Sequence, residues 1–293
     1  MKEFPRTMVE NISLPRMLIG SNWMVGFSHR SAAADAMIKE KFSTKEAVCD
    51  VISAYLEYGI DAMMACFIEM DLKPKQVIMD GIHMAEQKMG RKVTLIDTPV
   101  LDVRDTEEAR DYCKRKIELI RKNGADICLV HHSSAEQLVS KLNKTMDRLP
   151  DYTKMIRENG MVPGLSAHMP ELIVYSDLHP EYDVQTYIQI YNCMGFLMQV
   201  EIEGVRRIIE NAKKPVMTIK SMAAGRCTPY VGITFSYATL RPQDMVTVGA
   251  HSVREVHEDV EIAMAALERR FPDLERRQSP NMNTDALAGH MKK

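Results

Sequence analysis

The sequence predicts a single closed (β/α)8 barrel, an α/β fold, on two observations. Eight short apolar runs are spaced along the chain, and a stretch with helical signals follows each of them. Strands that alternate with helices of this length indicate a parallel sheet. The length agrees, because one barrel typically takes about 250 residues and the chain has 293.

The expected strands are short, and most of them end in a polar residue. They cover residues 17–20, 62–66, 93–97, 127–131, 161–166, 184–191, 216–220 and 245–249. Active sites of such barrels form at the carboxyl ends of the strands and in the loops that follow. Polar residues at these ends are therefore the first candidates for chemistry.

The helical stretches carry start and stop signals. Ser43 and Glu46 have the spacing of a capping box, Val48 and Val51 begin an apolar periodicity, and Gly59 is placed to end this helix. Further helices are expected over residues 74–89, 106–122, 134–146, 170–177, 200–212, 230–240 and 252–270. The barrel domain then spans residues 1–271, and a polar tail spans residues 272–293.

Charged residues stand at the entrances of the expected strands. Four aspartates precede the even-numbered strands and three basic residues precede odd-numbered ones: Asp61, Asp126, Asp183, Asp244, Arg16, Lys92 and Lys214. Because the amino-terminal face of this fold usually serves stability, we expect a structural ring of alternating charge there.

Composition excludes several classes of partner. A net charge of −2 with mixed signs gives no basic face for nucleic acid. No run approaches the ~20 apolar residues of a membrane span, and the first residues lack a signal-peptide core. Six cysteines without a CxxC pair indicate reduced thiols. We expect a cytoplasmic enzyme acting on a small molecule, and the sequence allows a homo-oligomer.

Motifs in a fixed order along the chain resemble those of the aldo-keto reductases. They are Asp126 to His131 (D-x-x-x-x-H), Gly164-Leu165-Ser166, Tyr191-Asn192, Ser221 to Gly225, and Gly249 followed by Glu258-Asp259. The similarity spans residues 1 to about 265. It implies an amino-terminal hairpin within residues 1–20 and, as one alternative, an NADP site. The implied cofactor residues are Ser166, Gln189, Asn192, Arg226, Gly249, Ser252 and Arg254.

Most of that family's catalytic tetrad is absent from the corresponding positions. Its aspartate falls on Met64, its proton-donating tyrosine near Glu69 and its lysine on Pro99. The histidine has a counterpart in His131. The departures put the family's usual carbonyl reduction in doubt.

The predicted mouth is rich in metal-ligand types instead. Asp97, His131, His132 and His168 lie at or just after strand ends, and histidine nitrogens with carboxylate oxygens suit a divalent transition metal. Adjacent strand residues point to opposite sides, so one of the two neighbouring histidines would face the interior unless the strand has ended. Asp97 could instead accept hydrogen bonds from the amides of the following turn.

Three further side chains are candidate catalytic groups. Glu69 could be an acid or base, or a solvated loop residue; His131 could act directly as well as bind metal; and Lys220 could anchor a substrate or form a structural ion pair.

Three functions remain open from the sequence. The leading hypothesis is non-redox, metal-assisted lyase, isomerase or hydrolase chemistry on an oxygenated metabolite. The second is an NADP-dependent oxidoreductase with an altered proton donor. The third is a catalytically inactive barrel that serves as a binding or regulatory subunit.

Overall fold

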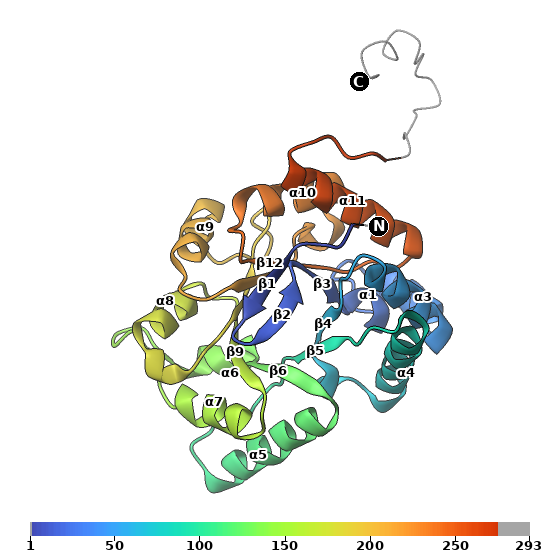
Figure 1. Cartoon of the computed structure of the whole chain (residues 1–293). Helices are drawn as coiled ribbons and strands as arrows, with labels where there is room; N and C mark the ends of the chain where they lie inside the picture. The colour runs from blue at the N-terminus through green and yellow to red at the C-terminus, as the bar shows by residue number, and fades with distance from the viewer. Residues whose placement is uncertain (1, 275–293) are drawn as a thin grey trace, which may run out of the picture.

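A computed structural model describes residues 2–274 of the chain, and it confirms the predicted barrel (Figure 1). Eight parallel strands close in the order β10-β11-β12-β3-β4-β5-β6-β9. Their bounds are β3 (Met17–Gly20), β4 (Ala62–Ala65), β5 (Thr94–Asp97), β6 (Ala125–Val130), β9 (Val162–Ala167), β10 (Tyr187–Ile190), β11 (Val216–Ile219) and β12 (Met245–Val248). Each strand falls within or close to an apolar run of the sequence.

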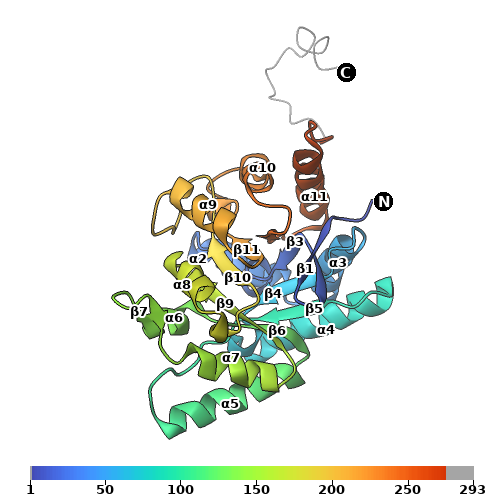
Figure 2. The ribbon, with the colours of Figure 1, turned by 60° about the vertical axis from the view of Figure 1, so that its left-hand side comes forward.

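The hairpin that the family resemblance implies closes one end of the barrel. It consists of β1 (Arg6–Val9) and β2 (Ile12–Pro15), which pair antiparallel. Val9 and Leu14 are fully buried and pack with Leu18, Ile96 and other inward-facing strand residues. In Figure 2 the hairpin lies on the right, whereas α2 (Ala32–Lys41), α6 (His132–Ala135) and β7 (Val139–Ser140) lie on the left, at the opposite end.

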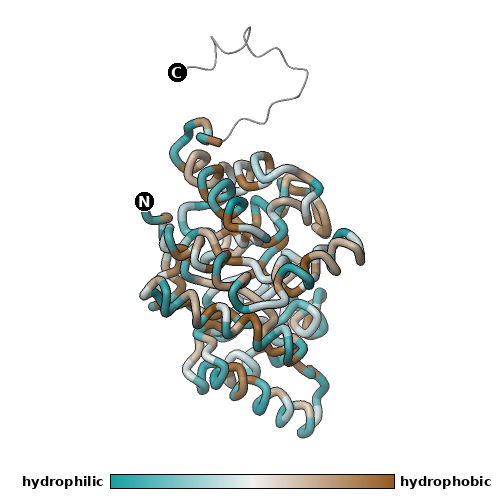
Figure 3. The backbone as a smooth tube through the Cα atoms, turned by 90° about the vertical axis from the view of Figure 1, so that its right-hand side faces the viewer, coloured by the Kyte–Doolittle hydropathy of each residue, from teal (hydrophilic) through white to brown (hydrophobic). Residues whose placement is uncertain are grey.

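Most predicted helices are confirmed to within about two residues. They are α3 (Lys45–Leu56), α4 (Leu72–Met89), α5 (Glu107–Lys122), α8 (Glu171–Leu178), α9 (Ile202–Asn211), α10 (Pro229–Thr239) and α11 (Val253–Glu268). The first begins one residue later than its capping box suggests, because the Thr44 hydroxyl accepts the Ala47 amide and Ser43 bonds to Glu40 instead. Figure 3 shows hydrophilic and hydrophobic residues interspersed along the chain.

The predicted helix over residues 134–146 is wrong. After α6 the chain makes a 3-10 turn (Glu136–Leu138) and a small hairpin of β7 and β8 (Thr145–Met146). The helix of this barrel unit is α7 (Leu149–Glu158), which begins after Arg148 takes a left-handed φ of 60°. Pro150 in its first turn suits a helix start and not a helix interior.

The segment after β3 contains two helices that the sequence pattern did not indicate, α1 (Asn22–Val25) and α2. Ser31 caps α2 by accepting the Ala34 amide. Asp35 accepts hydrogen bonds from both the amide and the hydroxyl of Ser28. These bonds fix the course of the loop between the two helices.

The charged residues at the strand entrances have structural partners, as expected, but the partners are mainly arginines outside the predicted ring. Asp61 binds Arg6 and Arg91, and Asp183 binds Arg157. The carboxylate of the fully buried Asp244 accepts hydrogen bonds from the Arg241 side chain and from the amide of Val216. The aspartates therefore tie strand starts to loops and to the hairpin.

Side chains alternate between the barrel interior and the outer layer along each strand. Met64, Ile96, Leu129 and Ile188 belong to the inner core. Two larger apolar clusters lie outside the strands, one centred on α3, α4 and α11 and the other on α5, α7 and α8. No helix within residues 2–274 is both long and apolar enough to cross a bilayer. All but residues 272–274 of the predicted tail lie outside the described residues.

Helices α3 and α4 approach so closely at Gly81 that a side chain would not fit. A Cβ atom there would lie 2.5 Å from Val48 Cβ and 2.8 Å from the Lys45 carbonyl oxygen. Gly81→Ala is therefore expected to lower the free energy of unfolding by about 1–3 kcal/mol, the usual cost of overpacking, in urea titrations.

Gly204→Ala is the matched control. A Cβ at Gly204, in α9, would meet Val200 Cγ2 at 3.6 Å, an ordinary van der Waals contact with the segment before the helix. There the change should stabilise by about 0.5–1 kcal/mol. Equal effects at the two positions would contradict the close approach of α3 and α4.

Asp97 generates a prediction about pH. Asp97 is 1% exposed, and burial raises the pKa of its carboxyl to about 7 despite hydrogen bonds from the amides of Ile68 and Thr98. Because the folded-state pKa lies above the unfolded value of about 3.9, the stabilisation is complete below pH ~4 and is lost as pH rises through about 7. Urea titrations between pH 5 and 8 should show a smaller loss of stability for Asp97→Asn than for the parent. Parallel curves would contradict the burial of a protonated carboxyl.

Candidate active site at the barrel mouth

A cavity of about 960 Å³ opens at the carboxyl ends of the strands. This volume is at the upper end of the range for small-molecule sites. Its strand-end lining includes Met64, Ser166, Ile188, Ile219 and Thr247. These residues come from β4, β9, β10, β11 and β12, so the cavity stands over the barrel interior.

One wall is formed by the segment after β3. Asn22, Trp23, Phe27 and His29 all line the cavity. Trp23 lies 5.3 Å from the ring of His251, and a Cβ at Gly249 would come within 3.0 Å of Trp23 Cδ1. Because Gly249 has no side chain, the Trp23 indole can pack against the end of β12.

His131, His132 and His168 form a stack on the opposite wall. The ring centroids of His131 and His132 are 4.2 Å apart, and those of His132 and His168 are 3.6 Å apart at an interplanar angle of 20°. All three residues line the cavity. Strict alternation does not separate the first two, because β6 ends at Val130 and His132 already opens α6.

The three imidazoles have lowered pKa values. Burial is the largest cause for each: it lowers the pKa of His131 to about 4 and that of His168 to about 3, and it lowers the pKa of His132 against the opposing charge of Glu136. Neighbouring positive charge from Lys220 acts in the same direction on His132 and His168. The stack is therefore neutral near pH 7.

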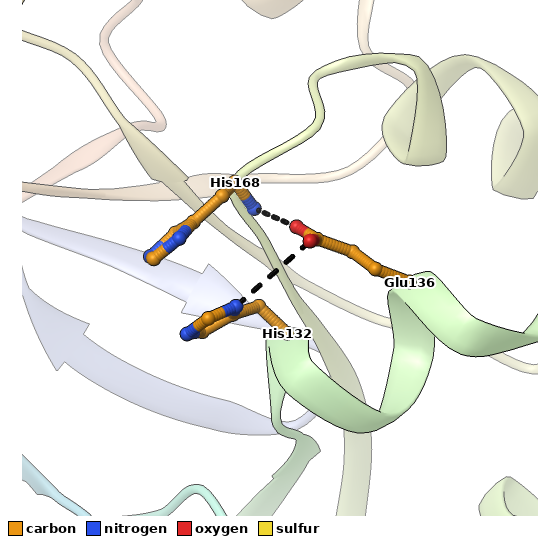
Figure 4. A group of neighbouring side chains, drawn as sticks. All are labelled: His132, Glu136 and His168. Carbon is orange, nitrogen blue, oxygen red and sulfur yellow. Dashed lines mark hydrogen bonds and ion pairs between the residues drawn. The ribbon is translucent and has the colours of Figure 1, made fainter. Parts of the chain in front are cut away.

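Glu136 joins this stack, although the sequence analysis did not single it out. Its Oε1 accepts the amides of His168 and Met169 at 2.9 and 3.1 Å, and its Oε2 lies 4.0 Å from His132 Nδ1 (Figure 4). The available signal was its spacing of four residues from His132, which places two side chains on one face of a helix.

Lys220 follows the end of β11 and points to the β3 segment. It adopts a left-handed φ of 62°, and its Nζ lies 3.2 Å from Nε2 of His29. Burial lowers the pKa of Lys220. Within residues 2–274 no carboxylate comes within ion-pair distance of this ammonium group. The predicted substrate anchor is thus in the cavity without an acidic partner.

Glu69 and Asp97 both accept hydrogen bonds from backbone amides. Glu69 lies at the cavity edge, but its Oε1 binds Lys116 at 2.5 Å and accepts the Val100 amide at 2.8 Å. Asp97 does not line the cavity, and it accepts the Thr98 amide, as the alternative interpretation of the sequence anticipated. Asp97 is also absent from the metal-ligand cluster of the described residues, which contains His132, Glu136 and His168.

The predicted cofactor residues separate into two groups. Ser166 and Gly249 line the cavity. The other five make local contacts. Gln189 donates to the carbonyls of His168 and Ile190, and Asn192 donates to the carbonyl of Phe196. Ser252 caps α11, Arg254 pairs with Glu258, and Arg226 lies over the Phe196 ring. Gln189 Oε1 is buried without a hydrogen-bond partner in the described part of the chain.

Comparison with known proteins finds similarity in structure alone. No family model matches the sequence, and no curated protein is detectably similar to it. A protein from Pseudomonas aeruginosa assigned to the aldo-keto reductases aligns over 90% of this chain and 94% of its own, with 13% identity and a TM-score of 0.62. An aldo-keto reductase from Klebsiella pneumoniae, solved with NADPH, aligns over 96% of this chain and 99% of its own, with 14% identity and a TM-score of 0.57. An aldo-keto reductase from Brucella melitensis aligns over 89% of this chain and 98% of its own, with 11% identity and a TM-score of 0.54.

These similarities correct the leading hypothesis from the sequence. The three barrels are described as aldo-keto reductases, and the Klebsiella structure was solved with NADPH. The NADPH in that structure agrees better with the second hypothesis, an NADP-dependent oxidoreductase, than with the first. In its fold, this chain is a distant aldo-keto reductase-like barrel with an amino-terminal hairpin.

Proposed function

We propose that this protein is an enzyme, an NADP-dependent reductase of small carbonyl compounds in which Lys220 replaces the usual proton donor. The observation that carries the proposal is the position of Lys220, a half-buried ammonium group in the mouth cavity with His29 as its hydrogen-bond partner. A positively charged donor in such a position stabilises a carbonyl oxygen that gains negative charge during reduction.

The cavity fits a nicotinamide nucleotide in size and in chemistry. Its volume is about 960 Å³, Trp23 offers an aromatic face, and the hydroxyl-bearing Ser166 lies at the end of β9. Two cationic side chains, Lys220 and Arg30, lie near the end of β11. Arg30 lies beside Gly225, where a Cβ atom would be 3.5 Å from Arg30 Nη1. We expect Trp23, Ser166 and Gly249 to hold the nucleotide ring and Arg30 to meet its phosphates.

Lys220 would act by position and charge. NADPH supplies a hydride when bound. The Lys220 ammonium donates a hydrogen bond to the substrate carbonyl oxygen and transfers a proton to it as the C=O double bond becomes a single bond. The product is an alcohol, and the lysine amine then regains a proton from water. His29 accepts a hydrogen bond from the Lys220 ammonium group and so orients the lysine side chain before substrate binds.

Trp23 permits a direct binding test because it is the one tryptophan of the chain. NADPH should quench the fluorescence of Trp23 in a saturable titration and raise the melting temperature. The absence of both effects up to millimolar nucleotide would overturn the proposed cofactor.

Lys220→Met should lower kcat for NADPH oxidation by small aldehydes and ketones by about 10²- to 10⁴-fold, the usual contribution of a positioned acid. Nucleotide affinity should change much less. Turnover would be followed by the loss of NADPH absorbance.

The control for that variant is Lys154→Met, an exposed lysine on α7 that pairs with Glu158. It should leave turnover unchanged. NADPH binding without turnover of any carbonyl compound by the parent protein would favour an inactive binding subunit instead.

A further inference from the structure

The wall of the cavity opposite Trp23 contains a cluster of two imidazoles and one carboxylate. His132, Glu136 and His168 each offer a ligand atom, and these atoms all lie within 4.8 Å of one another. The residues come from α6, from the 3-10 turn after it and from the end of β9 (Figure 4). Strand β9 is the barrel neighbour of β6, which leads into α6.

The carboxylate of this cluster is held in place through one oxygen only. Glu136 Oε1 accepts the amides of His168 and Met169, so the carboxylate is fixed against the backbone of the other ligand segment. Oε2 faces His132 Nδ1 at 4.0 Å, which is too long for a hydrogen bond. This oxygen is therefore available to a further partner.

Within residues 2–274, the rings of His132 and His168 make no side-chain hydrogen bond within 3.5 Å. His132 contacts the rings of His131 and His168 and lies 4.0 Å from Glu136 Oε2, and the ring of His168 stacks on that of His132. His131 differs, because its Nδ1 bonds to Ser133. The ring nitrogens of His132 and His168 are therefore not committed to another side chain of the described residues.

We propose that His132, Glu136 and His168 bind one divalent transition-metal ion, of the class of Zn²⁺ or Co²⁺. Two histidine nitrogens and one carboxylate oxygen are a common donor set for such ions when a coordination position stays open. The proposal concerns binding and does not depend on the reductase function proposed above.

Binding requires a small local rearrangement. Ligand atoms about 2.0–2.1 Å from a tetrahedral ion lie roughly 3.3–3.4 Å apart, so the present separations must shorten. The two rings must also turn out of their 20° stack for their lone pairs to converge. The Glu136 carboxylate can stay on its amides during this change, and it offsets the charge of nearby Lys220.

The remaining coordination positions would face the cavity. His132 and His168 both line it, whereas Glu136 lies behind them. Water or an oxygen atom of a small molecule could therefore complete the coordination.

Cobalt provides a test that is independent of turnover. The full chain, freed of metal with a chelator, is titrated with CoCl2 while visible absorption is recorded. We expect a saturable band at about one ion per chain, displaced by Zn²⁺. His168→Ala and Glu136→Gln should each weaken Co²⁺ binding at least about tenfold, since even groups that only orient a metal ligand contribute about 10- to 100-fold.

His179→Ala is the matched control, because His179 binds Glu181 at 2.9 Å outside the cavity and belongs to no group of three ligand residues in the described part of the chain. It should leave the band and its stoichiometry unchanged. The two site variants would be compared with the parent by circular dichroism, and Glu136→Gln keeps an oxygen that can accept the two amides. No band in the parent, or an undiminished band in both folded site variants, would overturn the proposal.

Discussion

The alternation of side chains around a closed parallel barrel is the constraint on which the rest of this structure depends. Successive residues of a strand face either the barrel interior or the surrounding helices. Ser166 and Met64 consequently reach the cavity, whereas Asp97 does not, although all three stand close to strand ends. Closure of the eight strands places the inward-facing residues under one common mouth.

Beyond the strand ends, local turns replace alternation as the determinant of direction. His131 and His132 both reach the cavity because β6 has ended and α6 has begun. Lys220 does so from a left-handed conformation, and His29, which also has a positive φ, meets it from the segment after β3. The two are 191 residues apart in the sequence.

The charges near the mouth are unevenly compensated, and this imbalance connects the two proposals. Glu69 is neutralised by Lys116 outside the cavity centre, and the three stacked imidazoles are neutral near pH 7. Lys220 keeps a positive charge without a carboxylate partner among the described residues, a charge suited to a developing oxyanion or a phosphate. Glu136 supplies the opposite charge on the histidine side, where a cation could be held.

The sequence by itself determined the barrel, its strands and most of its helices, because hydrophobic periodicity and capping residues act locally along the chain. It also identified His131, His132, His168 and Lys220 as residues of the mouth. Only the tertiary structure decided that Glu69 and Asp97 bind backbone amides, that Gln189 lies away from the cavity and that Glu136 joins the histidines. Such contacts depend on where strands end and which loops meet, and residues distant in the sequence fix both. The helix predicted over residues 134–146 failed for the same reason, since Tyr182, far along the chain, accepts the Met146 amide of the hairpin found there.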